Sequence, residues 1–217
     1  MELSDDKSIE AAVIFNKYAH EYQGKFMDVS LYKGTLKTFC NFINKENAKV
    51  LDVACGPGNV TKYLLREKPN LIVLGIDLAT NMISLARCNN PNATFKVMDC
   101  RSISSLTEKF DAVVSAFCLP YLSKEETHKL VNDISALLSD QGVCYISTME
   151  NDYNKSGYET GSKGDQIYMH YYEKDYLINV LTSCNFKIEE VSRIVSTMSN
   201  GKEVTDLIII SRKKNGL

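Results

Sequence analysis

The sequence lacks the features that mark several large classes of protein. Its 25 basic and 27 acidic residues give a net charge of −2, whereas a dedicated nucleic-acid-binding protein normally has a strong basic excess. The longest fully apolar runs have about five residues, far short of the ~20 that a membrane-spanning helix needs. Residues 1–6 lack the basic and apolar regions of a signal peptide. We therefore expect no nucleic-acid partner and no membrane partner.

Cysteine motifs are missing as well. The seven cysteines are odd in number and widely spaced, and no two of them form a C-x-x-C pair. This pattern argues against a disulfide framework and against a cysteine zinc site, and it is typical of a reducing compartment. No acidic cluster near residues 110–117 suggests a magnesium site. We predict a cytoplasmic protein without a bound metal.

Length and composition indicate one globular domain. At a prior of ~150 residues per domain, 217 residues correspond to one α/β domain with additions. The apolar fraction of 44% and the charged fraction of 24% are ordinary for a globular protein. A chain of this length can bury a core without disulfides or metals.

The chain reads as alternating helices and strands after an N-terminal helical region. Apolar residues at helical spacing predict helices within 7–22 and 30–44, with a break near Gly24. The expected strands are 50–53, 71–76, 93–98, 110–117 and 142–149. The expected helices between them are 59–66, one capped by Thr80 that runs to about residue 88, and one opened by a capping box at Ser123 and Glu126 that runs to about residue 138.

The pattern of these strands predicts a parallel sheet that closes with an antiparallel hairpin. Strands that are apolar throughout and alternate with helices are typical of a doubly wound α/β sheet covered on both faces. Residues 186–194 and 203–212 form two further strands. The Asn-Gly pair within 199–202 favours a tight type I′ turn between them.

A glycine-rich loop follows the first strand. Residues 50–58 read Val-Leu-Asp-Val-Ala-Cys-Gly-Pro-Gly and lead directly into a helix. Glycine allows positive φ and lets the backbone approach a ligand, and the free N–H groups of the helix would face that ligand. Taken alone, the motif could equally be a tight turn that binds nothing.

Two carboxylates at the ends of the next strands also indicate a ligand site. Asp77 ends the second strand about 20 residues after the glycines, where a carboxylate can accept both ribose hydroxyls of an adenosine. Asp99 follows the third strand, where it can accept from an adenine amino group while the Cys100 N–H donates to the ring. Ligands of such sheets bind at the carboxyl ends of the strands, so three sites at consecutive strand ends predict a nucleoside-containing cofactor.

Four segments resemble motifs of the class I S-adenosylmethionine-dependent methyltransferases: residues 52–58, 75–78, 98–100 and 110–115. The resemblance covers roughly residues 9–212 and is greatest to the small-molecule branch that includes the ubiquinone and menaquinone C-methyltransferases. Residues 15–22 are similar to the N-terminal lid of that branch. The resemblance implies a Rossmann-like, mostly parallel seven-stranded sheet and S-adenosyl-L-methionine as the cofactor.

The resemblance also implies that residues 1–217 form a single domain with four segments. Residues 1–46 would form a helical lid and 47–150 the cofactor-binding core. Residues 151–172 would be a variable segment on the substrate side, and 173–217 a C-terminal helix and hairpin. The implied activity is methyl transfer to a small-molecule acceptor. An RNA or protein methyltransferase and a non-catalytic methyltransferase-like partner subunit remain alternatives, and the oligomeric state is not predicted.

Cofactor roles follow from the resemblance position by position. Asp52 would organise the glycine loop near the cofactor ammonium, and Asp77 would bind the ribose. Tyr22 would close over the cofactor, or else pack on the sheet as an ordinary helix residue. The remaining implied contacts are to the methionine moiety from Ala54, Gly56, Gly58, Ala116 and Phe117, and to the adenine from Leu78, Met82, Asp99 and Cys100. Leu78 and Met82 could instead be plain core residues.

Candidates for catalysis are His170 and Tyr121. His170 lies in the aromatic stretch 166–172, which follows a polar insertion at 151–165. In the family this region often shapes the substrate pocket, but the same pattern fits an edge strand whose tyrosines pack on the sheet. A base is not obligatory if the acceptor is a thiolate, an amine or an acidic carbon.

Two competing enzyme classes fit the sequence less well. A dinucleotide-binding loop would have a third glycine or alanine where Thr61 stands, and the chain contains no Tyr-x-x-x-Lys pair, so an NAD-dependent oxidoreductase is disfavoured. Residues 115–121 read Ser-Ala-Phe-Cys-Leu-Pro-Tyr rather than an Asn-Pro-Pro-Tyr motif, which disfavours an adenine-N6 methyltransferase.

Overall fold

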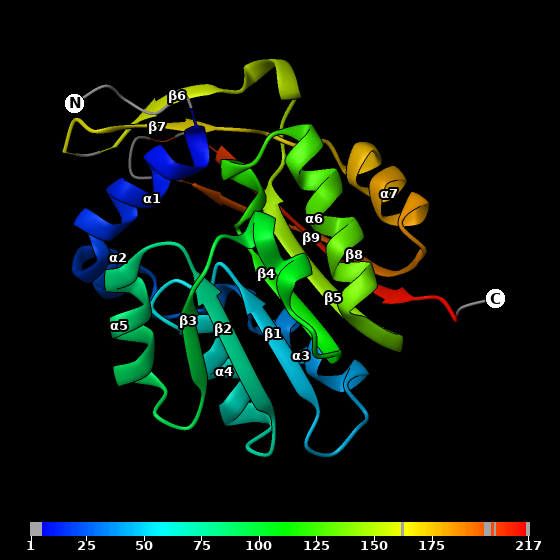
Figure 1. The fold of residues 1–217 in the computed structure, drawn as a ribbon. Helices are drawn as coiled ribbons and strands as arrows, with labels where there is room; N and C mark the ends of the chain where they lie inside the picture. The colour runs from blue at the N-terminus through cyan, green and yellow to red at the C-terminus, as the bar shows by residue number, and fades with distance from the viewer. Residues whose placement is uncertain (1–5, 162, 198–200, 202, 216–217) are drawn as a thin grey trace.

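A seven-stranded sheet forms the centre of the molecule (Figure 1). The computed structural model describes residues 6–161, 163–197, 201 and 203–215. The strands lie in the order β3-β2-β1-β4-β5-β9-β8. Their bounds are β1 Lys49–Val53, β2 Ile72–Asp77, β3 Thr94–Val97, β4 Phe110–Ala116, β5 Leu138–Met149, β8 Phe186–Thr197 and β9 Glu203–Lys213. The first five strands are parallel, and β9 runs antiparallel to both β5 and β8, so the expected sheet with its closing hairpin is confirmed.

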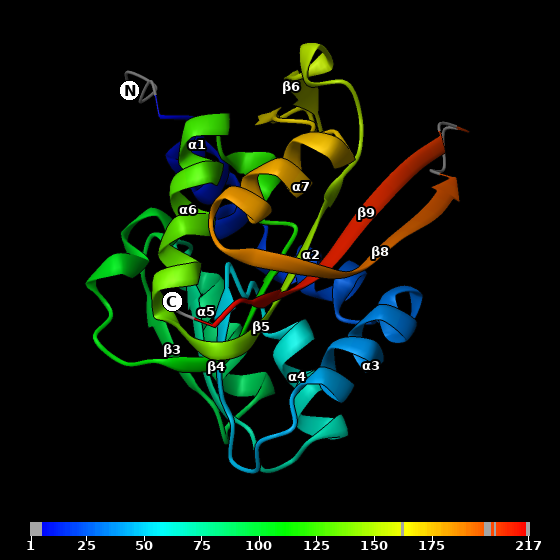
Figure 2. The same cartoon turned by 90° about the vertical axis from the view of Figure 1, so that its right-hand side faces the viewer.

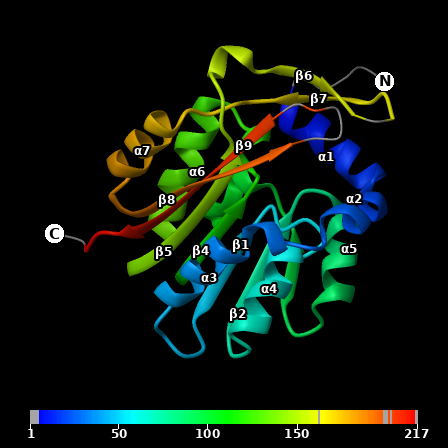
Figure 3. The same ribbon diagram turned by 180° about the vertical axis from the view of Figure 1, so that it is seen from behind.

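Helices cover both faces of this sheet (Figures 1 and 3). One face carries α3 Lys33–Phe42, α4 Asn59–Glu67 and α5 Thr80–Asn89, and the other carries α6 Lys124–Leu137 and α7 Lys174–Ser183. The helices α1 Lys7–Lys17 and α2 Ala19–Phe26 lie at the carboxyl edge of the parallel strands. Short 3₁₀ turns are η1 Ser30–Tyr32, η2 Cys100–Ser105, η3 Leu119–Tyr121 and η4 Tyr153–Lys155. Among the described residues, no helix is long and apolar enough to cross a membrane.

Strand periodicity divides the core into two clusters. In β1, Leu51 and Val53 pack with α6 and α7, whereas Val50 packs with α3 and α4. In β9, Leu207 and Ile209 join the first cluster, and Ile208 and Ile210 join the second. Because side chains alternate across a strand, both faces of the central strands are buried, as their apolar sequences predict.

The N-terminal helices differ from the prediction. The predicted break near Gly24 lies a few residues later, because α2 runs through Gly24 to Phe26 and η1 begins at Ser30. A second break, at Tyr18 (φ −109°, ψ 24°), was not predicted. No atom lies within 4 Å of where a Cβ at Gly24 would be, so the glycine marks neither a turn nor a close approach. Tyr18 separates α1 from α2, which puts α1 against α5 and β7.

The predicted cap of α5 is also wrong. Thr80 is the first residue of the helix, and Ala79 is its N-cap. The Ala79 N–H donates to Asp77 Oδ1 at 2.8 Å, and the Asn81 N–H donates to Asn16 Oδ1 at 2.8 Å. The first N–H groups of a helix have no partner within the helix. At the start of α5, those of Ala79 and Asn81 are bound by side chains of β2 and α1 rather than by Thr80.

Smaller differences concern the edges of the sheet. The strand predicted at 93–98 is the edge strand β3, and Val97 is exposed rather than buried. The strand β5 begins at Leu138, directly after α6 and before the predicted residue 142. The hairpin of β8 and β9 extends from the body of the molecule (Figure 2). Of the predicted turn at 199–202, only Gly201 is described, with φ +82°, and the rest lies outside the described residues.

Residues 151–172 form a separate small sheet. The strands β6 Gly157–Thr160 and β7 Gln166–Met169 pair antiparallel. They lie over α1 at the carboxyl edge of the central sheet (Figures 1 and 3). Tyr168 thus lies within this hairpin and His170 directly after it, and neither is in the central sheet.

Candidate functional site

A cavity opens at the carboxyl ends of β1 to β4 and is roofed by α1. Its empty space, with the open mouth included, is about 760 Å³. Every residue for which a cofactor contact was predicted lines it except Asp52 and Gly58. These lining residues are Tyr22, Ala54, Gly56, Asp77, Leu78, Met82, Asp99, Cys100, Ala116 and Phe117.

The loop between β1 and α4 has the strained backbone expected of a ligand-binding turn. Ala54, Gly56 and Gly58 all have positive φ, at 54°, 51° and 77°. The loop is fixed by the Cys55 N–H, which donates to the Ile76 carbonyl at 2.9 Å. Tyr22 covers the loop, since its Cε1 would lie 3.8 Å from a Cβ at Gly56. A non-glycine residue at φ 54° is uncommon and is a frequent mark of functional sites.

Asp77 connects this loop to the start of α5. Its Oδ2 accepts the Gly56 N–H at 2.9 Å, and its Oδ1 accepts the Ala79 N–H at 2.8 Å. Burial raises the pKa of Asp77, and these backbone donors oppose the rise. A carboxylate has about four lone-pair sites. Asp77 can therefore hold the loop and still accept hydrogen bonds from a ligand in the cavity.

Asp52 and Gly58 lie behind the loop and do not line the cavity. Asp52 is only 1% exposed, and its Oδ2 accepts from the Thr61 hydroxyl of α4 at 2.6 Å. Burial raises its pKa to about 7, the Thr61 hydrogen bond opposes the rise, and the charge of Asp77 adds to it. Gly58 is the N-cap of α4, and its N–H donates to the Cys55 carbonyl at 2.9 Å. Both residues support the loop from below.

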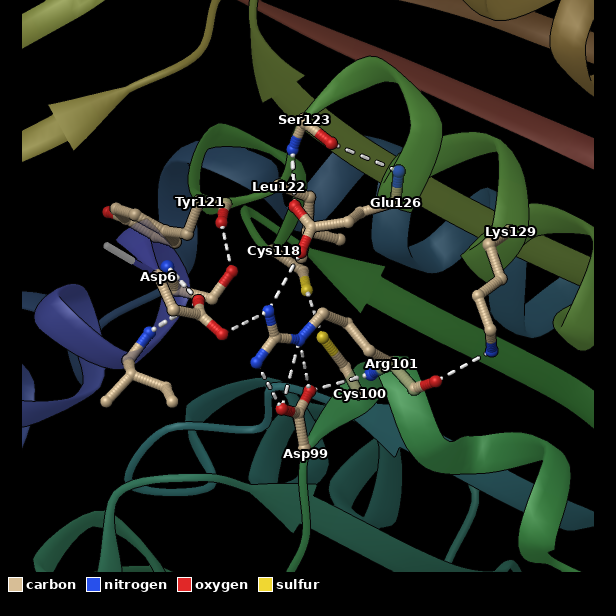
Figure 4. A network of polar contacts seen from close by, with 12 residues as sticks. Asp6, Asp99, Cys100, Arg101, Cys118, Tyr121, Leu122, Ser123, Glu126 and Lys129 are labelled. Carbon is tan, nitrogen blue, oxygen red and sulfur yellow. Dashed lines mark hydrogen bonds and ion pairs between the residues drawn. The ribbon is translucent and has the colours of Figure 1, made fainter. Parts of the chain in front are cut away.

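Asp99 and Cys100 form the wall of the cavity that follows β3 (Figure 4). The Asp99 carboxylate accepts from the Nε and Nη2 atoms of Arg101, at 3.0 and 2.6 Å. Burial would raise the pKa of Asp99, but the hydrogen bonds and charge of Arg101 outweigh it and lower that pKa below its usual value. Cys100 Sγ lies 3.6 Å from Cys118 Sγ.

The roof of the cavity was largely missed at the sequence level. Ser8, Ala11, Ala12 and Phe15 of α1 line it, and so do Met98, Cys118 and Leu122. The four α1 residues have the i, i+3, i+4, i+7 spacing of one helix face, so the signal was present. The sequence alone does not say that this face turns to the carboxyl edge of the sheet. Phe15 packs edge-on against both Tyr22 and Tyr121.

The structure separates the two catalytic candidates. Tyr121 lines the cavity, and burial raises its pKa above its ordinary value. His170 does not line it. The His170 Nδ1 lies 3.2 Å from the Tyr153 hydroxyl, the backbone N–H of His170 donates to the Pro120 carbonyl, and burial lowers the pKa of the imidazole. Within the described part of the chain, no group of three or more His, Cys, Asp or Glu side chains could hold a metal ion.

Comparison with known proteins finds methyltransferases. Residues 50–142 match the family model described as a methyltransferase domain. A putative methyltransferase, 235L, of Invertebrate iridescent virus 6 is 34% identical over 110 residues, which cover 49% of this chain and 40% of that protein. Residues 50–142 are thus similar to a methyltransferase domain. The alignments span less than half the length of the first curated relatives.

Solved structures with the same methyltransferase fold cover nearly the whole chain. A DhpI complex with SAH superposes with a TM-score of 0.76 at 18% identity, covering 99% of this chain and 100% of that one. The 1,6-didemethyltoxoflavin-N1-methyltransferase of Burkholderia thailandensis superposes with a TM-score of 0.72 at 19% identity, covering 99% and 93%. The fold shared with these structures therefore extends beyond the 50–142 match to α1, α2 and the β8–β9 hairpin.

Proposed function

We propose that this protein transfers a methyl group from S-adenosylmethionine to a small-molecule acceptor. One observation carries the proposal: the cavity at the strand ends places Asp77, Asp99 and the loop at 54–58 around a single ligand-sized space. The similarity of residues 50–142 to a methyltransferase domain supports it. The predicted ribose and adenine residues occupy one side of the cavity, and the loop and Phe117 occupy the other.

The residues present fit the two ends of that cofactor. Asp77 would accept the ribose hydroxyls, and Leu78 and Met82 supply apolar surface for the adenine. Asp99 would accept from the exocyclic amino group of the adenine. The positive φ values of Ala54 and Phe117 expose backbone at the opposite end, which would hold the methionine moiety. Asp52 would act through the loop rather than by touching the ammonium.

When bound, the cofactor supplies an activated methyl group on its sulfonium. The chain's part is then to orient the acceptor and to exclude water. Phe15, Tyr22 and Tyr121 close the cavity from above. Burial raises the pKa of both tyrosines, that of Tyr22 to about 12, so both remain protonated at neutral pH and can donate but not accept a proton.

The lining therefore favours an acceptor that needs little help in losing a proton. His170 would have to act at a distance from the cavity, so we propose orientation rather than base catalysis as the role of Tyr121. The aromatic roof favours a flat apolar or aromatic molecule over a long charged polymer. Quinone precursors, the acceptors of the ubiquinone and menaquinone C-methyltransferases that the sequence resembles, are one such class.

Calorimetric titration with S-adenosylmethionine, S-adenosylhomocysteine and NAD tests the cofactor. We expect micromolar binding of the first two and no binding of NAD. Binding of NAD alone would contradict the proposal. A panel of small aromatic phenols, quinols and heterocyclic amines, assayed for release of S-adenosylhomocysteine, then tests the acceptor. Turnover only on RNA or peptide substrates would contradict the small-molecule part.

A further inference from the structure

Arg101 lies where the wall of the cavity meets its roof (Figure 4). Its guanidinium contacts three carboxylates from three different parts of the fold. Nε and Nη2 bind Asp99 at the end of β3, and Nη1 binds both Asp6 before α1 and Glu126 of α6, each at 2.8 Å. The Arg101 side chain is only 20% exposed. A planar guanidinium with five donors suits such a junction better than an ammonium does.

The contact with Asp6 holds the beginning of the roof helix. Asp6 is the N-cap of α1, and its Oδ1 accepts the N–H groups of Ser8 and Ile9 at 3.0 and 3.2 Å. Its Oδ2 is the atom that Arg101 binds. The Ser8 hydroxyl adds a hydrogen bond of 2.6 Å to the Tyr121 carbonyl. The first turn of α1 is thus attached to the cavity wall through the contact between Asp6 and Arg101 and through Ser8.

The contact with Asp99 fixes a carboxylate that lines the cavity. Arg101 binds it through Nε, Nη2 and its own backbone N–H, which lies 2.8 Å from Oδ1. A carboxylate held by a fork of donors has one orientation. Asp99 can therefore present its remaining acceptor capacity to a ligand without first losing side-chain freedom.

Lys129 of α6 does not take the place of Arg101 in these contacts. Lys129 Nζ donates to the Arg101 carbonyl at 2.7 Å and to Asp133 at 2.6 Å. Without the guanidinium, the carboxylates of Asp6, Asp99 and Glu126 would face one another across a partly buried space. Like charges at this spacing repel, so the roof helix would move away from the wall.

We propose that Arg101 is a positioning residue that couples recognition of the adenine amino group to closure of α1 over the cavity. The same guanidinium orients Asp99 and holds Asp6, so a ligand that engages Asp99 favours the closed roof. This inference rests on the proposed cofactor. It adds a residue that touches neither cofactor nor acceptor, together with a link between two ends of the site that are 95 positions apart in the chain.

Two matched variants test the roof contact. Asp6→Asn keeps an N-cap side chain but loses the charge that faces Arg101. Glu126→Gln keeps its capping box with Ser123 and loses the same charge on the core side. In ligand-free protein, we expect amide hydrogen exchange of residues 7–17 to rise about fivefold in Asp6→Asn, which corresponds to ~1 kcal/mol, and to stay unchanged in Glu126→Gln. Equal exchange in both variants would overturn the roof contact.

Binding kinetics test the coupling. By surface plasmon resonance, Asp6→Asn should raise both the association and the dissociation rate of S-adenosylhomocysteine, because an open roof admits and releases ligand faster. Arg101→Met should do the same and should also reduce the preference for S-adenosylhomocysteine over S-inosylhomocysteine, which lacks the amino group. A purely structural role would lower affinity without changing that preference.

Two further outcomes are decisive. If Arg101→Met keeps the full adenine preference, the coupling is overturned. If Arg101→Met does not fold, Arg101→Lys replaces it, because an ammonium keeps the charge but cannot hold Asp6 and Asp99 together. The same loss of preference for S-adenosylhomocysteine is then expected. If the unaltered protein binds no S-adenosylhomocysteine, the proposed function and the adenine coupling both fail, while the exchange comparison still decides whether Arg101 holds α1.

Discussion

We expect Asp77 to contribute more to the proposed cofactor affinity than any other single side chain. Its carboxylate lines the cavity and is already oriented by Gly56 and Ala79. Asp77→Ala should weaken S-adenosylhomocysteine binding about a hundredfold, since losing two charge-assisted hydrogen bonds costs ~3 kcal/mol. Calorimetry measures the affinity, and circular dichroism checks that the fold is retained. Affinity near that of the unaltered protein would remove Asp77 from the ribose site.

Tyr22 should contribute less than Asp77. Its ring lies over Gly56 and against Phe15, so Tyr22→Ala opens part of the roof without removing a charged contact. We expect a smaller loss of affinity for S-adenosylhomocysteine than in Asp77→Ala, measured in the same titration. The opposite order of the two variants would show that Tyr22 does more than cover the loop.

Asp52 should make stability depend on pH. In the unfolded chain its pKa is near 3.8, and burial raises it to about 7 in the folded protein. Between these values the unfolded state gives up the proton first, so the free energy of unfolding falls as pH rises from about 4 to about 7. In Asp52→Asn, the amide oxygen can still accept the hydrogen bond from the Thr61 hydroxyl, but the side chain does not titrate.

Urea denaturation across this pH range measures the effect. The stability of the unaltered protein relative to Asp52→Asn should decrease steadily as the pH rises through the window. Parallel stability curves for the two proteins would mean that Asp52 ionises with an ordinary pKa.

The sequence predicted those site residues whose position follows from topology alone. Asp77 ends β2 and Asp99 lies two residues after β3, and the carboxyl ends of parallel strands meet at one edge. Asp52 was predicted to lie near the cofactor ammonium, whereas its carboxylate is buried within β1 and accepts from Thr61 of α4. The contact between Asp6 and Arg101 had no local signal, because each residue alone resembles an ordinary surface charge.

At the scale of single elements, the turn into α4 has no room for a side chain at Gly58. A Cβ at Gly58 would lie 2.3 Å from Asn90 Nδ2 and 3.3 Å from the Ala86 backbone, at φ +77°. Gly58→Ala should therefore destabilise the protein by ~1–3 kcal/mol. Gly24→Ala is the matched control: Gly24 lies in α2 with free space around it, so the substitution should stabilise by ~0.5–1 kcal/mol.

Chemical denaturation of both variants gives the comparison. Equal effects of the two substitutions would show that the turn before α4 relaxes easily. The same pair of glycines explains one error of the sequence analysis. A glycine in the sequence does not say whether φ is positive, so Gly24 was taken for the break itself, although α2 continues through it to Phe26.

At the scale of the whole molecule, β9 joins the two halves of the core. Ile209 packs in the cluster with α6 and α7, and Ile208 packs in the cluster with α3 and α4. Ile208→Ala and Ile209→Ala should each destabilise by ~2–5 kcal/mol. Val195→Ala, at a β8 position that is 60% exposed, should cost less than ~0.5 kcal/mol.

Thermal unfolding of the three variants tests whether the halves form one cooperative unit. A single transition that shifts with either isoleucine is expected. Two separate transitions, each sensitive to only one of them, would show that the clusters unfold independently. The sequence predicted the antiparallel hairpin itself but not the order of its strands, because the apolar run 207–210 suits any central position.

The position of β9 between β5 and β8 has a consequence for how the protein is made on the ribosome. Parallel strands β1 to β5 and the helices between them emerge first, and until β9 follows, the twelve-residue strand β5 is an open edge. Open edges pair readily with other chains, and slow parallel sheets prolong that exposure. Nascent chains that stall before residue 203 should therefore be the form of this protein that chaperones bind and that aggregates first.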